Sequence, residues 1–183
     1  MRLVFPVAGY RWRTHEGAPI IRVPVVTGNR FRAGEHEGVD IMFARLPDDD
    51  RSGDTGGEHP RYDVPSKYGP ALILAPADGT VLYAKGHRNG LRVRTRHDLL
   101  GVDFVSLHLR QLLVRAGQEV RAGDPLGFLW YDPTDRERLA HDHFETRKRT
   151  HDPGMTLDAF GCIPVDPMPF LENATVIGPW FER

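Results

Sequence analysis

The sequence has little of several features that would assign it to a common class of protein. It contains a single cysteine, Cys162, which excludes an intrachain disulfide framework and a structural zinc site built on several cysteines. Its 24 lysines and arginines nearly cancel its 25 aspartates and glutamates, leaving a net charge of -1. This balance gives no bulk attraction to nucleic acid or to an anionic membrane. No apolar run approaches the length of a membrane span, so we expect neither partner.

The first residues also lack the pattern of a secretory signal peptide. The stretch MRLVFPVAGYRWRT has a proline and charges where such a peptide needs an uninterrupted apolar run. The sequence therefore predicts cytoplasmic storage, export by another route, or a leader that is absent from this stretch of sequence.

Helical periodicity is missing, whereas turn residues are frequent. The 19 glycines and 15 prolines are spread along the chain, a distribution typical of short strands joined by tight turns. The clearest hairpin joins Leu91–His97 to Val102–Leu109 through DLLG, and strict alternation would place Phe104 and His108 on one face. The stretch ALILAPADGTVLYAKG is typical of two strands joined by an Asp-Gly turn. We predict a mostly β fold in one domain, residues 1–183.

Residues 46–69 interrupt this rhythm with a polar segment rich in glycine, proline and aspartate. Part of it, DDDRSGD, matches the start of a calcium-binding loop, but His59 stands where that loop needs a glutamate. An inserted surface loop is the better interpretation.

Two short motifs carry ligand-type side chains. HDH places His141 and His143 two residues apart, so they leave the same face of a strand. A solvated edge strand would explain this doublet equally well. HEGVD places His36 and Asp40 four apart, with Gly38 allowing a tight turn between them. Together, His36, Asp40 and one histidine of the doublet supply three protein ligands, which leaves one tetrahedral position open, as in a catalytic zinc site.

Several motifs in the same order resemble the lysostaphin-type (M23-like) metallopeptidases, zinc endopeptidases that cut peptide cross-links in bacterial cell walls. The resemblance runs from about Phe31 to Leu171. It rests on HEGVD, APADGTVLYA, VSLHL, VRAGQEVRAGDPLG, HDHFE and the closing VDPMPFL.

The resemblance implies antiparallel sheets in a barrel-sandwich-like domain with long loops around the site. It also implies that zinc binds His36, Asp40 and His143, while His108 and His141 stand beside the metal and handle protons. The expected reaction is hydrolysis of a peptidoglycan stem or cross-bridge peptide by metal-activated water, outside the cytoplasm. The alternative is a non-catalytic binding or activator module with the same fold. Two other metal-binding classes fit less well. D-Ala-D-Ala carboxypeptidases lack the doublet, and in cupins the remaining ligands follow it.

Two segments depart from the family pattern. The bulky, charged WYDPTDRERLA precedes the doublet where many relatives have small residues, and the insertion at 46–69 has no counterpart in simple members. The sequence therefore leaves open the bond that is cut, the role of the insertion, the division of roles between His108 and His141, and the oligomeric state.

Overall fold

The structure is a computed structural model that describes residues 2–13, 19–44, 62–63, 71–87, 90–129 and 141–178. Only residues 62–63 of the predicted insertion belong to this part, and WYDPTDRERLA (residues 130–140) lies outside it. The strands, in chain order, are β1 (Tyr10–Arg13), β2 (Pro19–Arg22), β3 (Pro24–Val26), β4 (Val39–Ala44), β5 (Tyr62–Asp63), β6 (Ala71–Leu74), β7 (Gly79–His87), β8 (Gly90–His97), β9 (Val102–Leu112), β10 (Glu119–Val120), β11 (Pro125–Leu129), β12 (Asp142–Arg149) and β13 (Cys162–Val165). A 3₁₀ turn (Asp98–Leu100) and one short helix, α1 (Met168–Leu171), complete the described elements.

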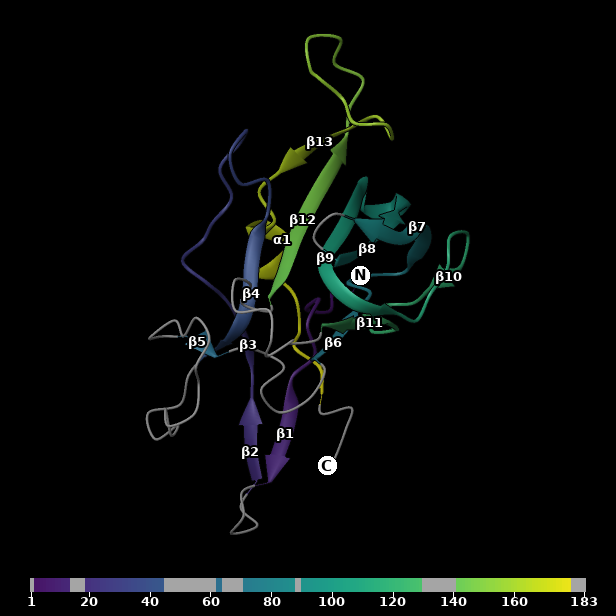
Figure 1. Cartoon of the computed structure of the whole chain (residues 1–183). Coiled ribbons are helices and arrows are strands. Elements are labelled where there is room, and N and C mark those ends of the chain that lie inside the picture. The colour runs from purple at the N-terminus through teal and green to yellow at the C-terminus, as the bar shows by residue number, and fades with distance from the viewer. Residues whose placement is uncertain are drawn as a thin grey trace.

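Most of these strands form one antiparallel sheet, with the order β10-β7-β8-β9-β12-β4-β3. β11 pairs with both β6 and β9, β13 pairs with β12, and β5 pairs with β4. The β1–β2 hairpin makes a separate sheet that extends away from the large one (Figure 1). The predicted mostly β, antiparallel class is confirmed, and the sheet is not closed into a barrel.

Strand β12 lies between β9 and β4 in the sheet (Figure 1). Phe144 and Thr146 are fully buried on its core side, where the Phe144 ring stacks on Phe104 with centroids 5.4 Å apart. Burying a side chain of this size contributes about 1.5–3 kcal/mol. Because side chains alternate along a strand, His143 and Glu145 project from the other face.

The predicted hairpin between β8 and β9 is confirmed, since the two strands pair in antiparallel register through the 3₁₀ turn. The two strands predicted for ALILAPADGTVLYAKG are present as β6 and β7, but they do not pair with each other. β6 pairs with β11, and β7 pairs with β8 and β10. The connection contains Ala75 and Ala77, both fully buried, so it passes along the core instead of reversing the chain at the surface.

Among the helices of the described residues, none has the length and apolar character needed to cross a membrane.

Candidate metal centre

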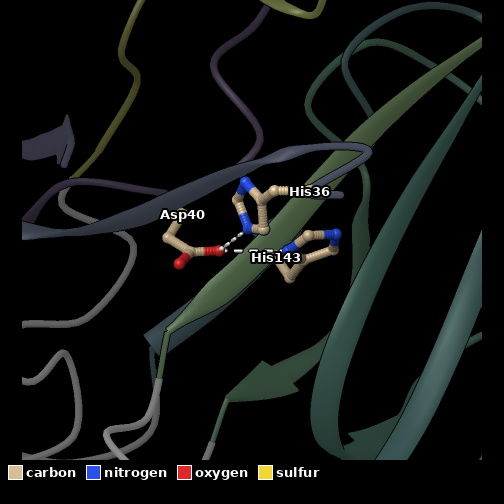
Figure 2. Close-up of side chains that lie close together, drawn as sticks. All are labelled: His36, Asp40 and His143. Carbon is tan, nitrogen blue, oxygen red and sulfur yellow. Dashed lines mark hydrogen bonds and ion pairs between the residues drawn. The ribbon is translucent and has the colours of Figure 1, made fainter. Parts of the chain in front are cut away.

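Three ligand-type side chains from distant parts of the chain converge beside β12. His36, Asp40 and His143 each offer one ligand atom, and these atoms all lie within 4.8 Å of one another. Figure 2 shows the Asp40 carboxylate facing both imidazole rings. Its Oδ1 lies 3.2 Å from His36 Nε2 and 3.0 Å from His143 Nδ1. The three residues that the sequence singled out as ligands are therefore brought together by the fold.

The sheet fixes two of these residues directly. Asp40 on β4 and His143 on β12 are register partners in the antiparallel pair. His36 lies in the turn before β4, where its backbone N–H donates to the carbonyl of Arg32 at 2.8 Å. Backbone pairing thus determines the spacing of the Asp40 and His143 side chains, and a short turn adds His36.

The glycine of HEGVD has a different role from the one expected. Gly38 is not among the described glycines with positive φ, so it is not needed for a tight turn. A Cβ atom at Gly38 would instead lie 2.6 Å from the carbonyl oxygen of Phe144 and 2.8 Å from His143 Nε2. Glycine is required because β12 passes too close for any side chain.

Hydrogen bonds hold the two histidine rings in a defined orientation. His36 Nδ1 lies 3.0 Å from the carbonyl oxygen of Arg30, an acceptor, so Nδ1 donates a proton there and Nε2 is the ring nitrogen that faces Asp40. His143 Nε2 lies 3.5 Å from Glu145 Oε1, which leaves Nδ1 toward Asp40. Binding the second ring nitrogen to a carbonyl or a carboxylate is typical of metal-ligating histidines. Glu145 therefore lies on the same face of β12 as His143, beside the cluster.

One neighbour of the cluster was not expected from the sequence. Asn29 Nδ2 donates to Asp40 Oδ2 at 2.5 Å and lies 3.1 Å from His36 Nε2. An isolated asparagine in a loop before β4 gives no motif that could have identified it.

Electrostatics keep the central carboxylate ionised. Burial alone would raise the pKa of Asp40, but the hydrogen bond from His143, the charge of His141 and the amide of Asn29 hold that pKa well below its usual range. Burial also disfavours the charged form of His143, yet Asp40 and Glu145 raise its pKa to about 9. A metal ion would have to displace the His143 proton to bind this nitrogen.

The two other histidines of interest lie beside the cluster. The rings of His108 and His141 have centroids 4.6 Å apart, and His108 is 6.1 Å from the His143 ring. His141 Nε2 lies 3.6 Å from Asp40 Oδ1. Five side chains with ligand or proton-transfer chemistry therefore occupy one region: His36, Asp40, His108, His141 and His143.

His108 reaches this region through a β-bulge, so the predicted alternation along β9 is wrong at this point. Leu91 pairs with Leu109 and Val93 pairs with Ser106, which leaves Arg92 alone opposite both Leu107 and His108. His108 has φ 68°, the only positive value for a non-glycine residue in the described ranges. Such a backbone costs about 1–3 kcal/mol and typically occurs at functional sites. The bulge turns His108 away from the face that carries Phe104.

Three other residues with titratable side chains, Asp142, His97 and Cys162, are buried. Asp142 is fully buried, and its Oδ2 accepts a hydrogen bond from Ser106 Oγ at 3.2 Å. Burial raises the pKa of Asp142 to about 8. His97 is 1% exposed, lies 2.9 Å from the carbonyl oxygen of Asp78 through Nδ1 and packs against Phe104. Cys162 is buried as well.

One curated protein is similar in sequence to part of this chain. A curated relative described as a lipoprotein NlpD/LppB homolog from Pseudomonas aeruginosa is 36% identical over 101 residues, which is 54% of this chain and 29% of that protein. This chain thus spans less than a third of its curated relative.

Two solved structures share the fold. A candidate glycyl-glycine endopeptidase LytM from Ruminococcus gnavus has a TM-score of 0.60 at 21% identity, covering 98% of this chain and 64% of that one. Lysostaphin has a TM-score of 0.51 at 16% identity, covering 87% and 57%. At these identities, the likeness establishes the fold alone.

The sequence model of a protein family described as Peptidase family M23 matches residues 57–155, slightly more than half of the chain. The match includes His108, His141 and His143 and begins after His36 and Asp40, whose place in the site rests on the geometry. The chain belongs to peptidase family M23.

Proposed function

We propose that this protein is a zinc-dependent endopeptidase that hydrolyses peptide bonds in bacterial peptidoglycan cross-links. The observation that carries the proposal is the convergence of His36, Asp40 and His143, with their ligand atoms within 4.8 Å, beside His108 and His141. Two imidazole nitrogens and one carboxylate oxygen match the donor set of catalytic zinc sites, which keep a fourth position for water or substrate.

The proposed chemistry divides the five residues into two groups. His36, Asp40 and His143 would hold the zinc ion, which when bound makes a coordinated water more acidic and polarises the substrate carbonyl. His141, with Nε2 3.6 Å from Asp40 Oδ1, stands beside this ligand set. One ring of the His108–His141 pair accepts the proton of the attacking water. The other donates a hydrogen bond to the developing oxyanion or protonates the leaving amine.

One observation favours a second function. The curated relative is described as a lipoprotein, and that description names no enzyme. A non-catalytic module that binds the cell wall or activates another hydrolase would use the same fold without turnover. Either function takes place outside the cytoplasm, where peptidoglycan lies.

A combined metal and digestion experiment separates these functions. Metal content is measured on the purified protein, which is then incubated with peptidoglycans of different cross-link chemistry, with chelator, and with chelator followed by zinc. We expect about one zinc per chain and new peptide amines by mass spectrometry, lost in chelator and restored by zinc. Digestion of one cross-link type would identify the bond. A protein that binds peptidoglycan but carries no stoichiometric zinc and releases no amine would establish the non-catalytic module.

A further inference from the structure

A cavity of about 320 Å³ opens on the sheet face that carries His143. Its walls come from β7, β8, β9 and β12 and from residues 158–160. Two lining residues, Leu107 and Glu145, also adjoin the metal cluster. Leu107 is the register partner of His143, and Glu145 Oε1 lies 3.5 Å from His143 Nε2. The cavity therefore begins where the proposed catalytic site ends.

Two of the four basic side chains in this cavity are neutralised within the protein. Arg94 pairs with Asp103 and Asp158, each at 2.7 Å. Arg147 pairs with Glu145 at 2.6 Å and with Glu37 at 2.8 Å. Because each of these two arginines already pairs with two carboxylates, neither is well placed to bind a further anion.

The other two basic side chains, Lys85 and Arg92, make no ion pair with any of the residues described. Their shared contact is the Tyr83 ring, with Lys85 Nζ 5.1 Å and Arg92 Cζ 4.8 Å from its centroid. Arg92 Nε is buried and has no hydrogen-bond partner among these residues. A buried donor without an acceptor costs about 1–3 kcal/mol, so an acceptor that enters the cavity beside Arg92 would offset this cost.

The sheet aligns these cations with the metal cluster. His143 on β12 faces Leu107 on β9, Arg92 on β8 lies opposite the Leu107–His108 bulge, and Lys85 on β7 is the partner of Arg92. Neighbouring strands are about 4.8 Å apart, so the Arg92 backbone lies about 10 Å from that of His143. An extended peptide spans this distance in about three residues.

We propose that Arg92 and Lys85 form a subsite that binds a carboxylate of the peptide substrate within about three residues of the bond that is cut. The proposal rests on the peptidase function proposed above. Arginine recognises a carboxylate through two parallel N–H donors, and lysine adds a second positive charge. Cation–π contacts with the Tyr83 ring help to position both cations. A free carboxylate offers these donors two acceptor oxygens and a negative charge, whereas its amide offers one oxygen and no charge.

The test uses a pair of cross-linked wall peptides that differ only in whether their acidic groups are free carboxylates or amides. We expect the zinc-loaded wild-type protein to prefer the carboxylate form about tenfold or more, mainly through KM. Arg92→Met should abolish this preference, and Lys85→Met should reduce it. Arg115→Met, which removes an exposed charge outside the cavity, is the control and should retain the preference.

Calorimetry with the chelated protein separates failure of the subsite from failure of the proposed function. Binding that favours the carboxylate form and depends on Arg92, without cleavage of either peptide, would retain the subsite and refute the peptidase. Equal cleavage of both peptides would refute the subsite alone. Inorganic phosphate is the competing probe. Phosphate binding that is tighter than that of the carboxylate peptide and lost in Arg92→Met would overturn the carboxylate assignment.

Discussion

Asp40 and Asp103 lie in neighbouring regions of the same sheet, and the difference between their partners separates a candidate metal centre from a structural ion cluster. Asp103 is fully buried and accepts hydrogen bonds from Arg94 Nε at 2.9 Å and Arg96 Nε at 3.1 Å. Asp40 is partly exposed and faces histidines and an asparagine. Arginine keeps its charge, so the Asp103 cluster is complete within the protein. Histidine can lose its proton, so the Asp40 cluster can exchange protons for a metal cation.

The most severe test of this comparison is His143→Ala. Removing one of the three proposed ligands from the Asp40 cluster should abolish stoichiometric zinc binding and all peptidase activity, because the two remaining ligands would hold the ion too weakly. Metal analysis after gel filtration measures the loss. His151→Ala, which removes an exposed histidine, is the matched control and should retain zinc. Full zinc content in His143→Ala would contradict the assigned ligand set.

His108→Asn tests a residue of the same region that the proposal excludes from the ligands. Asparagine tolerates the positive φ at this bulge, so the fold should be preserved. We expect unchanged zinc content and a loss of about 10²–10⁴ in kcat, the range for removal of a general acid or base. Loss of zinc would instead place His108 among the ligands.

Asp103→Ala should disrupt the Asp103 ion cluster and leave the Asp40 cluster unchanged. It leaves Arg94 buried with Asp158 as its remaining partner, and we expect a destabilisation of about 3–5 kcal/mol. Urea denaturation measures this change, and the zinc content of the folded fraction should stay the same. Asp98→Ala removes an exposed carboxylate that pairs with Arg149 at 2.6 Å, and should cost less than about 1 kcal/mol. Similar losses for the two variants would show that burial of the Asp103 pairs contributes little.

The smallest effect concerns His97, a buried histidine outside both clusters. Burial lowers the pKa of His97, although the Asp78 carbonyl opposes this shift. The unfolded chain therefore takes up a proton near pH 6.5 that the folded protein resists, so stability falls as the pH drops below about 6.5. The decline between pH 7 and pH 5 should be on the order of 1 kcal/mol smaller in His97→Gln than in the wild type, measured by urea midpoints. Parallel pH profiles would show that His97 does not titrate on unfolding.

The sequence could predict the residues of the candidate metal centre because their spacing is local. A four-residue interval links His36 to Asp40, and a two-residue interval links His141, just before β12, to His143 within it. The bulge at His108 was hidden, since it depends on how β9 pairs with β8. Long-range pairing also decides the course of β6, whose partner β11 begins about fifty residues later. Asn29 remained undetected because its role arises from the position of Asp40 in space.

The pairing of β4 with β12 has a consequence for anyone who trims this protein to its recognisable family segment. A fragment that starts at residue 57 would retain three of the five histidine and carboxylate groups of the site but would lose β4. The Asp142–Phe144 part of β12 would then lose its partner strand, and the core cluster that contains Phe144 would lose Ile41 and Phe43. We expect such a fragment to aggregate through this exposed strand edge, so an expression boundary should lie upstream of His36.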